Sequence, residues 1–256
     1  ATISLCMIVK NESAVLARCL DSIADLMDEI IIVDTGSTDN TKEIAAQYTS
    51  RIYDFKWTSD FSAARNFSFS KATMEYIYTA DADEILDDAN RERFLRLKDA
   101  LLPEIEIVQM KYVTQGTFDT VLNAKKEYRP KLFRRLRTFT WIDPIHETVR
   151  LTPVTFDSDV EILHCPQSLH SKRDFSIFIK AFEHDGQFSP KIRTMYAKEL
   201  LKTGDKKDFT DAKPIFQLIF DNDPADDARK EAACVLARIY RMEDNKNEFF
   251  KLTMKD

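Results

Sequence analysis

The sequence has 256 residues, of which 44% are hydrophobic and 31% are charged. This balance is typical of a folded globular protein and argues against a disordered or membrane-spanning chain. The formal net charge of -6 argues against a general nucleic-acid-binding protein, because such a protein needs a basic surface to displace counterions from phosphates. The four cysteines are scattered without zinc-site spacing, and the apolar run 3–9 is too short to span a bilayer. We therefore expect a cytoplasmic protein with no membrane span and no export signal.

Strands and helices alternate through the first half of the chain. Residues 3–9 and 28–34 are nearly continuous apolar runs, which is typical of buried strands, and a polar turn and a helical pattern follow each of them. A short strand at 52–55, a helix at 61–72 and an apolar strand at 76–79 come next. This alternation predicts an α/β fold with a mostly parallel sheet and right-handed crossovers.

Three acids, Asp81, Asp83 and Glu84, follow the apolar run 76–79. Unpaired acids cannot remain in a buried layer, so we expect them at the edge where the carboxyl ends of the strands border a ligand crevice. The Asp81 and Asp83 carboxylates would suit Mg²⁺ or Mn²⁺, which prefer oxygen ligands and often share them with substrate phosphates. A solvated turn with a purely structural role is the alternative.

Glu12, Asp34 and Asp81 stand at the ends of three successive predicted strands. Their carboxylates could accept hydrogen bonds from a base or a ribose, while backbone N–H groups in the turn at Gly36 could face phosphate oxygens. The alternative is that Glu12, Asp34 and Asp39 merely cap helices. Together with the Asp81 and Asp83 pair, a nucleotide crevice is the better explanation.

The middle of the chain predicts a helix at 88–101 and a strand at 106–113. A basic run then covers residues 126–137. Most such runs are solvated faces, and the alternative is that Arg129 or Arg134 neutralises a diphosphate.

From residue 171 onward only helical patterns occur, with Phe175, Phe178, Ile179 and Phe182 on one face. Three residues recur after 36 positions, namely Arg193, Ala197 and Leu200 as Arg229, Ala233 and Leu236. That period is typical of stacked helical hairpins resembling tetratricopeptide repeats. We predict two domains, at 1–168 and 169–256, and expect the natural chain to continue past Asp256.

Four sequence blocks resemble the inverting family 2 glycosyltransferases with the GT-A fold. The blocks lie at residues 7–12, 33–39, 60–66 and 80–84, and the resemblance spans roughly residues 3–165. The Lys-Asn-Glu and Ala-Ala-Arg-Asn blocks are similar to the branch that contains peptide S- and O-glycosyltransferases and some bacterial lipopolysaccharide-core glucosyltransferases. The resemblance implies a nucleotide-diphospho-sugar transferase domain followed by a helical domain.

The resemblance also assigns roles to residues that would bind a UDP-sugar. Glu12, Asp34 and Arg65 would contact the nucleotide, and a guanidinium such as that of Arg65 can stack on a base or hold a diphosphate. The other expected contacts to the nucleotide sugar are Val9, Asn11, Gly36, Asn66, Asp81, Ala82 and Arg134. Asp83 would ligate the metal directly, and Asp81 would hold ribose or the metal through water. Glu84 would either support the metal site from behind or cap a helix.

Two later segments resemble the acceptor side and the closing strand of the family. After the aromatic segment that begins at Trp141, Glu147 is the expected general base, because an inverting transferase must remove the acceptor proton. His146 could instead take that proton or hold the sugar, and a structural ion pair is the alternative for Glu147. His164 is the third candidate metal ligand, and its imidazole suits Mn²⁺ better than Mg²⁺. A satisfied core histidine is the alternative.

The sequence thus predicts a metal-dependent inverting glycosyltransferase that moves a hexose or N-acetylhexosamine from UDP to a protein or glycan acceptor. The helical tail could hold a protein acceptor or a sister subunit, giving a homo-oligomer. Two other hypotheses are nucleotidyl transfer to a sugar phosphate and an inactive protein-binding module. The first is weakened because no Gly-rich loop with Arg or Lys follows the first strand.

Overall fold

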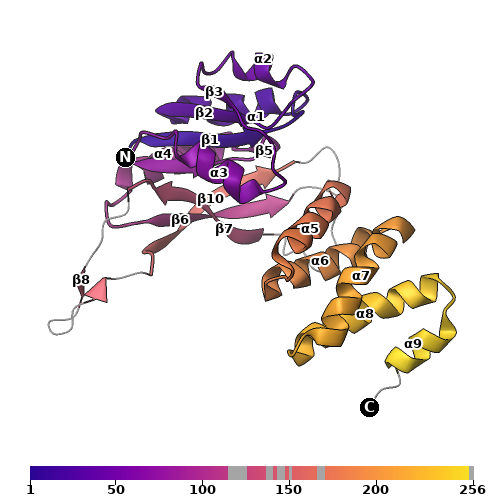
Figure 1. Cartoon of the computed structure of the whole chain (residues 1–256). Coiled ribbons are helices and arrows are strands. Elements are labelled where there is room, and N and C mark those ends of the chain that lie inside the picture. Colours follow the sequence, from indigo (N-terminus) through magenta and orange to yellow (C-terminus); the bar gives the residue numbers. More distant parts are fainter. Residues whose placement is uncertain (115–125, 137–140, 143–147, 150–151, 166–170, 254–256) are drawn as a thin grey trace. The chain divides into compact units, whose positions relative to one another are not determined.

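A computed structural model describes residues 1–114, 126–136, 141–142, 148–149, 152–165 and 171–253 (Figure 1). The chain divides into two compact units, Ala1–Gln167 and Ser168–Asp256. Each unit has its own apolar core. No helix in the described part of the chain is long and apolar enough to cross a membrane.

The first unit is built on a mixed sheet whose strand order is β3-β2-β1-β4-β7-β6-β10-β5. Strands β7 and β5 run antiparallel to their neighbours, and the other neighbouring pairs are parallel. The bounds are β1 Ile3–Val9, β2 Glu29–Asp34, β3 Ile52–Asp54, β4 Tyr76–Thr79, β5 Glu84–Ile85, β6 Ile107–Thr114, β7 Lys126–Arg134 and β10 Thr155–His164. A separate pair is formed by β8 Trp141–Ile142 and β9 Thr148–Val149.

Helices cover both faces of this sheet, which explains why its central strands are continuous apolar runs. Strand β1 illustrates the point, because Leu5 and Met7 enter the core cluster that contains α1 residues while Cys6 enters the opposite cluster. The helices of the first cluster are α1 Leu16–Ile23, α2 Thr41–Ala45 and α4 Asp88–Ala100, and α3 Phe61–Phe69 contributes to the second. The predicted α/β fold with a mostly parallel sheet is confirmed.

One predicted helix ends earlier in the structure, and one strand was not predicted. Helix α3 begins after Asp60, whose carboxylate accepts from the Ser62 and Ala63 N–H groups, but it ends at Phe69 and not at residue 72. The chain turns there through the hydrogen bond from the Ala72 N–H to the Phe69 carbonyl. The basic run beginning at Lys126 forms strand β7, which its sequence did not predict because the run lacks a regular apolar and polar alternation.

The second unit is helical, as the sequence predicts. Its helices are α5 Ser171–Asp185, α6 Pro190–Thr203, α7 Lys206–Asn222, α8 Asp226–Met242 and α9 Lys246–Thr253. Helices α6 and α8 begin 36 residues apart, which matches the period of the sequence. Leu200 and Leu236 are both buried, whereas the repeated arginine differs between the copies. Arg193 is buried and ion-paired with Glu231 at 2.7 Å, while Arg229 is partly exposed and donates to the Asp223 carbonyl.

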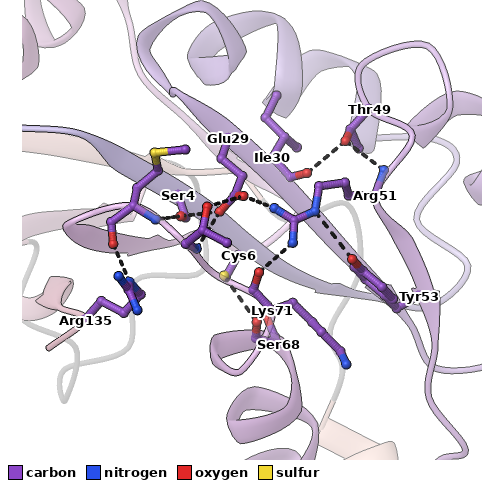
Figure 2. A network of polar contacts seen from close by, with 12 residues as sticks. Ser4, Cys6, Glu29, Ile30, Thr49, Arg51, Tyr53, Ser68, Lys71 and Arg135 are labelled. Atoms are coloured by element: carbon purple, nitrogen blue, oxygen red, sulfur yellow. Dashed lines mark hydrogen bonds and ion pairs between the residues drawn. The ribbon is translucent and has the colours of Figure 1, made fainter.

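A polar network joins the amino-terminal ends of β1 and β2 to the segments before β3 and β4 (Figure 2). Its centre is Glu29, whose side chain is only 7% exposed and pairs with Arg51. Glu29 also accepts from the Ser4 hydroxyl at 2.5 Å and from the Thr73 N–H and hydroxyl at 2.9 and 2.8 Å. Arg51 donates in turn to the Lys71 carbonyl at 2.6 Å. The network therefore ties four chain segments together at the end of the sheet where these strands begin.

We predict that Glu29→Ala lowers the free energy of unfolding of the first unit by about 3 kcal/mol, because it leaves a cation and several donors without their buried acceptor. Urea unfolding followed by circular dichroism measures this. Lys42→Met is the control, since the Lys42 and Asp54 pair is exposed and its loss should change little. Equal stability of the two variants would contradict the role assigned to Glu29.

Candidate functional site

The carboxyl ends of β1, β2 and β4 meet at one edge of the sheet. The parallel register pairs Val9 with Asp34 at the ends of β1 and β2, and β4 runs beside β1 in the same direction. The three loops that follow these strands therefore leave from the same edge. In open α/β sheets this edge borders the ligand crevice.

The loops after β1 and β2 are held together by hydrogen bonds. Asn11 adopts a left-handed backbone conformation with φ 56°, which asparagine tolerates better than most residues. Its N–H donates to the Ser37 hydroxyl at 2.9 Å, and its side-chain carbonyl accepts from the Thr38 N–H at 2.7 Å. The Glu12 N–H donates to the Thr41 hydroxyl at 2.8 Å. These hydrogen bonds join the two loops into one wall beside the edge of the sheet.

Asp34 is the buried acid of this wall and is only 2% exposed. Its Oδ2 accepts from the Gly36 and Ser37 N–H groups at 3.0 and 2.9 Å. The Gly36 N–H, which the sequence suggested could face a phosphate, is therefore directed at Asp34. The other oxygen, Oδ1, is buried and accepts no hydrogen bond from any residue that the structure describes. A buried carboxylate oxygen without a hydrogen-bond donor is energetically unfavourable. A bound ligand that donates a hydrogen bond to Oδ1 would remove this cost.

The exposed side chain of Asp39 also links the loops after β1 and β2. Its Oδ1 accepts from the Thr41 N–H and hydroxyl at 3.1 and 2.5 Å, and its Oδ2 accepts from the Ser13 N–H at 3.2 Å. Desolvation raises the pKa of Asp39, but these hydrogen bonds outweigh it and lower the pKa to about 2. Asp39 thus links the loop after β1 to the start of α2, whereas the N-cap position of α2 belongs to Asn40.

The segment after β4 exposes acids and buries alanines in turn. Ala80 and Ala82 are buried, while Asp81 is exposed and Asp83 is partly buried. Asp83 Oδ2 lies 3.0 Å from Nε2 of His164, and the Cys165 N–H donates to the Asp83 carbonyl at 3.0 Å. The structure therefore brings together two of the three predicted metal ligands, although 81 positions separate them in the sequence.

Asp81 faces a different partner. Its Oδ1 lies 3.9 Å from Nη2 of Arg65 on α3, and both side chains are substantially exposed. The next residue on α3, Asn66, is exposed as well. Within the described residues, no group of three or more His, Cys, Asp or Glu side chains has the spacing of a metal site. Asp81 therefore lies at the same edge but is not gathered with Asp83 and His164.

Glu84 and Lys131 form an ion pair that sequence reasoning missed. Lys131 Nζ lies 2.6 and 2.7 Å from the two carboxylate oxygens of Glu84, and the side chains are 7% and 2% exposed. Burial raises the pKa of Glu84, and the Lys131 ammonium opposes that shift. Glu84 begins β5 and does not cap a helix. The only signal in the sequence was the position of Lys131, where the basic run meets Leu132 and Phe133.

The register of β7 separates the two arginines considered for a diphosphate. Arg129 lies with its guanidinium 3.7 Å from the centre of the Tyr112 ring, and that ring is 5.0 Å from the ring of His164. Arg134 instead pairs with Tyr76, where β4 begins. The structure therefore brings Arg129 towards Asp83 and His164 and does not bring Arg134 there. Arg134 was predicted at this edge because the sequence does not reveal the direction of β7.

The predicted catalytic residues Glu147 and His146 lie outside the described residues. Their proposed roles as general base and as its alternative stay predictions. The remaining predicted contacts, Val9, Asn11, Glu12, Gly36, Arg65, Asn66 and Ala82, belong to the three strand ends or to α3.

Acids thus gather at the carboxyl ends of parallel strands, where open α/β sheets bind their ligands. The sequence family "Glycosyl transferase family 2" matches residues 4–152, more than half of the chain. The chain belongs to this family, and its first unit is a glycosyltransferase domain with the GT-A fold.

Curated relatives agree with this assignment. A stretch of 132 residues is 33% identical to the SPbeta prophage-derived glycosyltransferase SunS of Bacillus subtilis and covers 50% of this chain and 31% of SunS. A stretch of 107 residues is 31% identical to the lipopolysaccharide core biosynthesis glycosyltransferase LpsC of Rhizobium meliloti, covering 40% of this chain and 36% of LpsC. A TPR repeat-containing protein of Synechococcus elongatus is 48% identical over 86 residues, covering 34% of this chain and 21% of that protein. The matched stretches thus span about a fifth to about a third of these relatives.

Among solved structures, the chain is similar to glucosyl-3-phosphoglycerate synthase of Mycobacterium tuberculosis in complex with Mn²⁺ and UDP-glucose. The TM-score is 0.49 at 16% sequence identity, and the match covers 74% of this chain and 80% of that chain.

The lowered pKa of Asp39 predicts a pH-dependent contribution to stability. The ionised carboxylate stabilises the fold above the unfolded-state pKa of about 4, and this stabilisation is lost as the pH falls towards about 2. We therefore expect Asp39→Asn to be less stable than the natural chain at pH 7, with the difference shrinking between about pH 4 and pH 2. Urea unfolding across this range measures it. Thr41→Val removes one hydrogen-bond donor to Asp39, so the loss of stability with falling pH should begin at higher pH. A stability difference between Asp39→Asn and the natural chain that stays constant down to pH 2 would contradict the lowered pKa of Asp39.

Proposed function

We propose that this protein is a metal-dependent inverting glycosyltransferase that transfers a hexose or N-acetylhexosamine from a UDP-sugar to an acceptor hydroxyl, on a protein side chain. Family membership supports the reaction class. The observation that carries the donor assignment is the buried Oδ1 of Asp34, which accepts no hydrogen bond within the described part of the chain.

Asp34 would recognise the nucleoside. Its Oδ2 is occupied by the Gly36 and Ser37 N–H groups, so the carboxylate is held in one orientation and Oδ1 has a defined direction. A uracil imide N–H or a ribose hydroxyl would supply the donor that Oδ1 needs. Asn11, Glu12 and the Gly36 turn would form the wall beside the nucleoside, with Val9 beneath them.

Asp83 and His164 fit a divalent cation by their chemistry. A carboxylate oxygen and an imidazole nitrogen 3.0 Å apart are donors of the kind that Mn²⁺ accepts, and the imidazole is less suited to Mg²⁺. With Asp81 reaching the cation through water or holding the ribose, the diphosphate oxygens would complete the ligand set. A bound cation would offset the negative charge that develops on the departing UDP.

Basic and polar residues of the chain would orient the rest of the donor. Arg65 lies 3.9 Å from Asp81 and would hold the diphosphate or stack on the base, with Asn66 and Ala82 nearby. Arg129, which is stacked on Tyr112, is a second cation on the side of His164. Glu147 would remove the acceptor proton as the sugar is attacked on the face opposite UDP, with His146 as the alternative base.

The helical unit would bind a protein acceptor or a sister subunit. Stacked helical hairpins form concave surfaces that bind extended segments or sister subunits. A protein acceptor, or assembly of the enzyme through this unit, is therefore part of the proposal.

We predict that Asp34→Asn weakens UDP binding by about tenfold to a hundredfold, because the amide presents a donor where the nucleoside needs an acceptor. The side-chain carbonyl of asparagine can still accept from Gly36 and Ser37, so the loop should keep its shape. Isothermal titration calorimetry with UDP and Mn²⁺ measures the affinity. Asp54→Asn is the matched control, because Asp54 pairs with Asp34 in the sheet but is exposed. Equal affinities of the two variants would exclude Asp34 from the nucleoside site.

Asp83→Ala should abolish metal-dependent sugar transfer, with a loss of at least about a thousandfold in rate, because the departing diphosphate would lose several kcal/mol of stabilisation. Release of UDP from a panel of UDP-sugars, measured with and without Mn²⁺, tests this. Asp99→Ala, an exposed acid on α4, serves as the control. Release of pyrophosphate from UTP and a sugar phosphate, together with no release of UDP from any UDP-sugar, would favour nucleotidyl transfer and would overturn the proposal.

A further inference from the structure

Lys131 is a buried cation directly beneath the acidic segment that follows β4. Its ammonium lies 2.6 and 2.7 Å from the Glu84 carboxylate oxygens and 3.2 Å from the Thr79 carbonyl. Thr79 is the last residue of β4, and Glu84 is the first residue of β5. One side chain therefore contacts both ends of the segment 80–83, which carries Asp81 and Asp83.

The backbone of this segment is fixed at further points. The Glu84 N–H donates to the Asp81 carbonyl at 3.1 Å, and the Cys165 N–H donates to the Asp83 carbonyl at 3.0 Å. The Cys19 thiol lies 3.5 Å from the Asp81 carbonyl. The carboxylates of Asp81 and Asp83 consequently project from a short segment whose main chain has little freedom, with Lys131 at its base.

Lys131 also offsets the negative charge of the acidic segment that follows β4. Three carboxylates lie within four consecutive residues here, and Glu84 is nearly inaccessible to water. A buried carboxylate needs a nearby cation, and repulsion among neighbouring acids would otherwise push the segment open. Lys131 comes from the adjacent strand β7, in which Leu132 pairs with Tyr78. It neutralises Glu84 from within the sheet and leaves the surface side of the segment to Asp81 and Asp83.

We propose that Lys131 is a positioning residue for the metal site: through Glu84 and the Thr79 carbonyl it fixes the main chain of the segment 80–83, so that Asp83 stays beside His164, where a divalent cation would bind. This inference rests on the proposed function. It assigns to Lys131 no contact with the substrate. Its effect on the cation passes through the shape of the segment 80–83.

A merely structural ion pair would contribute stability alone, so the test separates stability from metal affinity. Mn²⁺ binding is measured by electron paramagnetic resonance in the presence of saturating UDP, and unfolding midpoints are measured without metal. The variants are Lys131→Met, Lys131→Arg and the double variant Lys131→Met with Glu84→Leu, which removes both buried charges. Lys126→Met is the matched control, because Lys126 lies on the same strand and pairs with Glu161 at 2.6 Å.

We expect Lys131→Met to weaken Mn²⁺ binding at least tenfold and to lower the unfolding midpoint. The double variant should recover most of the midpoint, since no unpaired buried charge remains, yet keep Mn²⁺ binding at least tenfold weaker than in the natural chain. Lys131→Arg should recover part of the affinity, and Lys126→Met should change it less than twofold. If Lys131→Met does not fold, the Mn²⁺ affinities of the double variant and of Lys131→Arg test the same inference.

Two results would overturn the inference in different ways. Mn²⁺ affinity within twofold of the natural chain in the double variant would make the pair a stabilising contact only, with the proposed function intact. Absence of Mn²⁺ binding to the natural chain with UDP would remove the metal site itself, and with it the proposed function and this role of Lys131.

Discussion

The structure depends on the parallel pairing of β1 with both β2 and β4. That register aligns the carboxyl ends of three strands, so the polar residues that follow each strand must share one edge. The central residues of these strands are buried and mostly apolar, and unpaired polar side chains would be unfavourable there. The gathering of polar groups at this edge is therefore a consequence of how the sheet is built.

Charge is distributed unequally along this edge. Asp39 and one oxygen of Asp34 accept hydrogen bonds from N–H groups of the loops, and Glu84 forms an ion pair with Lys131. Asp81 is exposed beside Arg65, and Asp83 is partly exposed beside His164. Carboxylates that are paired within the chain and carboxylates that are accessible therefore lie within a few residues of one another. This separation is the basis of the proposed sites for a UDP-sugar and a divalent cation.

Much of the fold could be predicted because its signals are local. Buried runs such as 3–9, the acids after β4 and the helical tail are each defined by neighbouring residues. The contact of His164 with Asp83 was expected only through resemblance to a family. Lys131 and Arg134 were beyond sequence reasoning, since their positions follow from the long-range register of β7 against β4, which residue patterns do not encode. The basic run had no alternation that would have revealed a strand.

We propose that the acids at this edge hold a uridine diphosphate through one nucleoside contact and one cation. A crystal structure of the protein with Mn²⁺ and UDP tests this most directly. We predict the uracil or ribose within hydrogen-bonding distance of Asp34 Oδ1, and Mn²⁺ bridging the diphosphate to Asp83. A nucleotide bound elsewhere, or bound here with Asp83 turned away from the cation, would contradict the account.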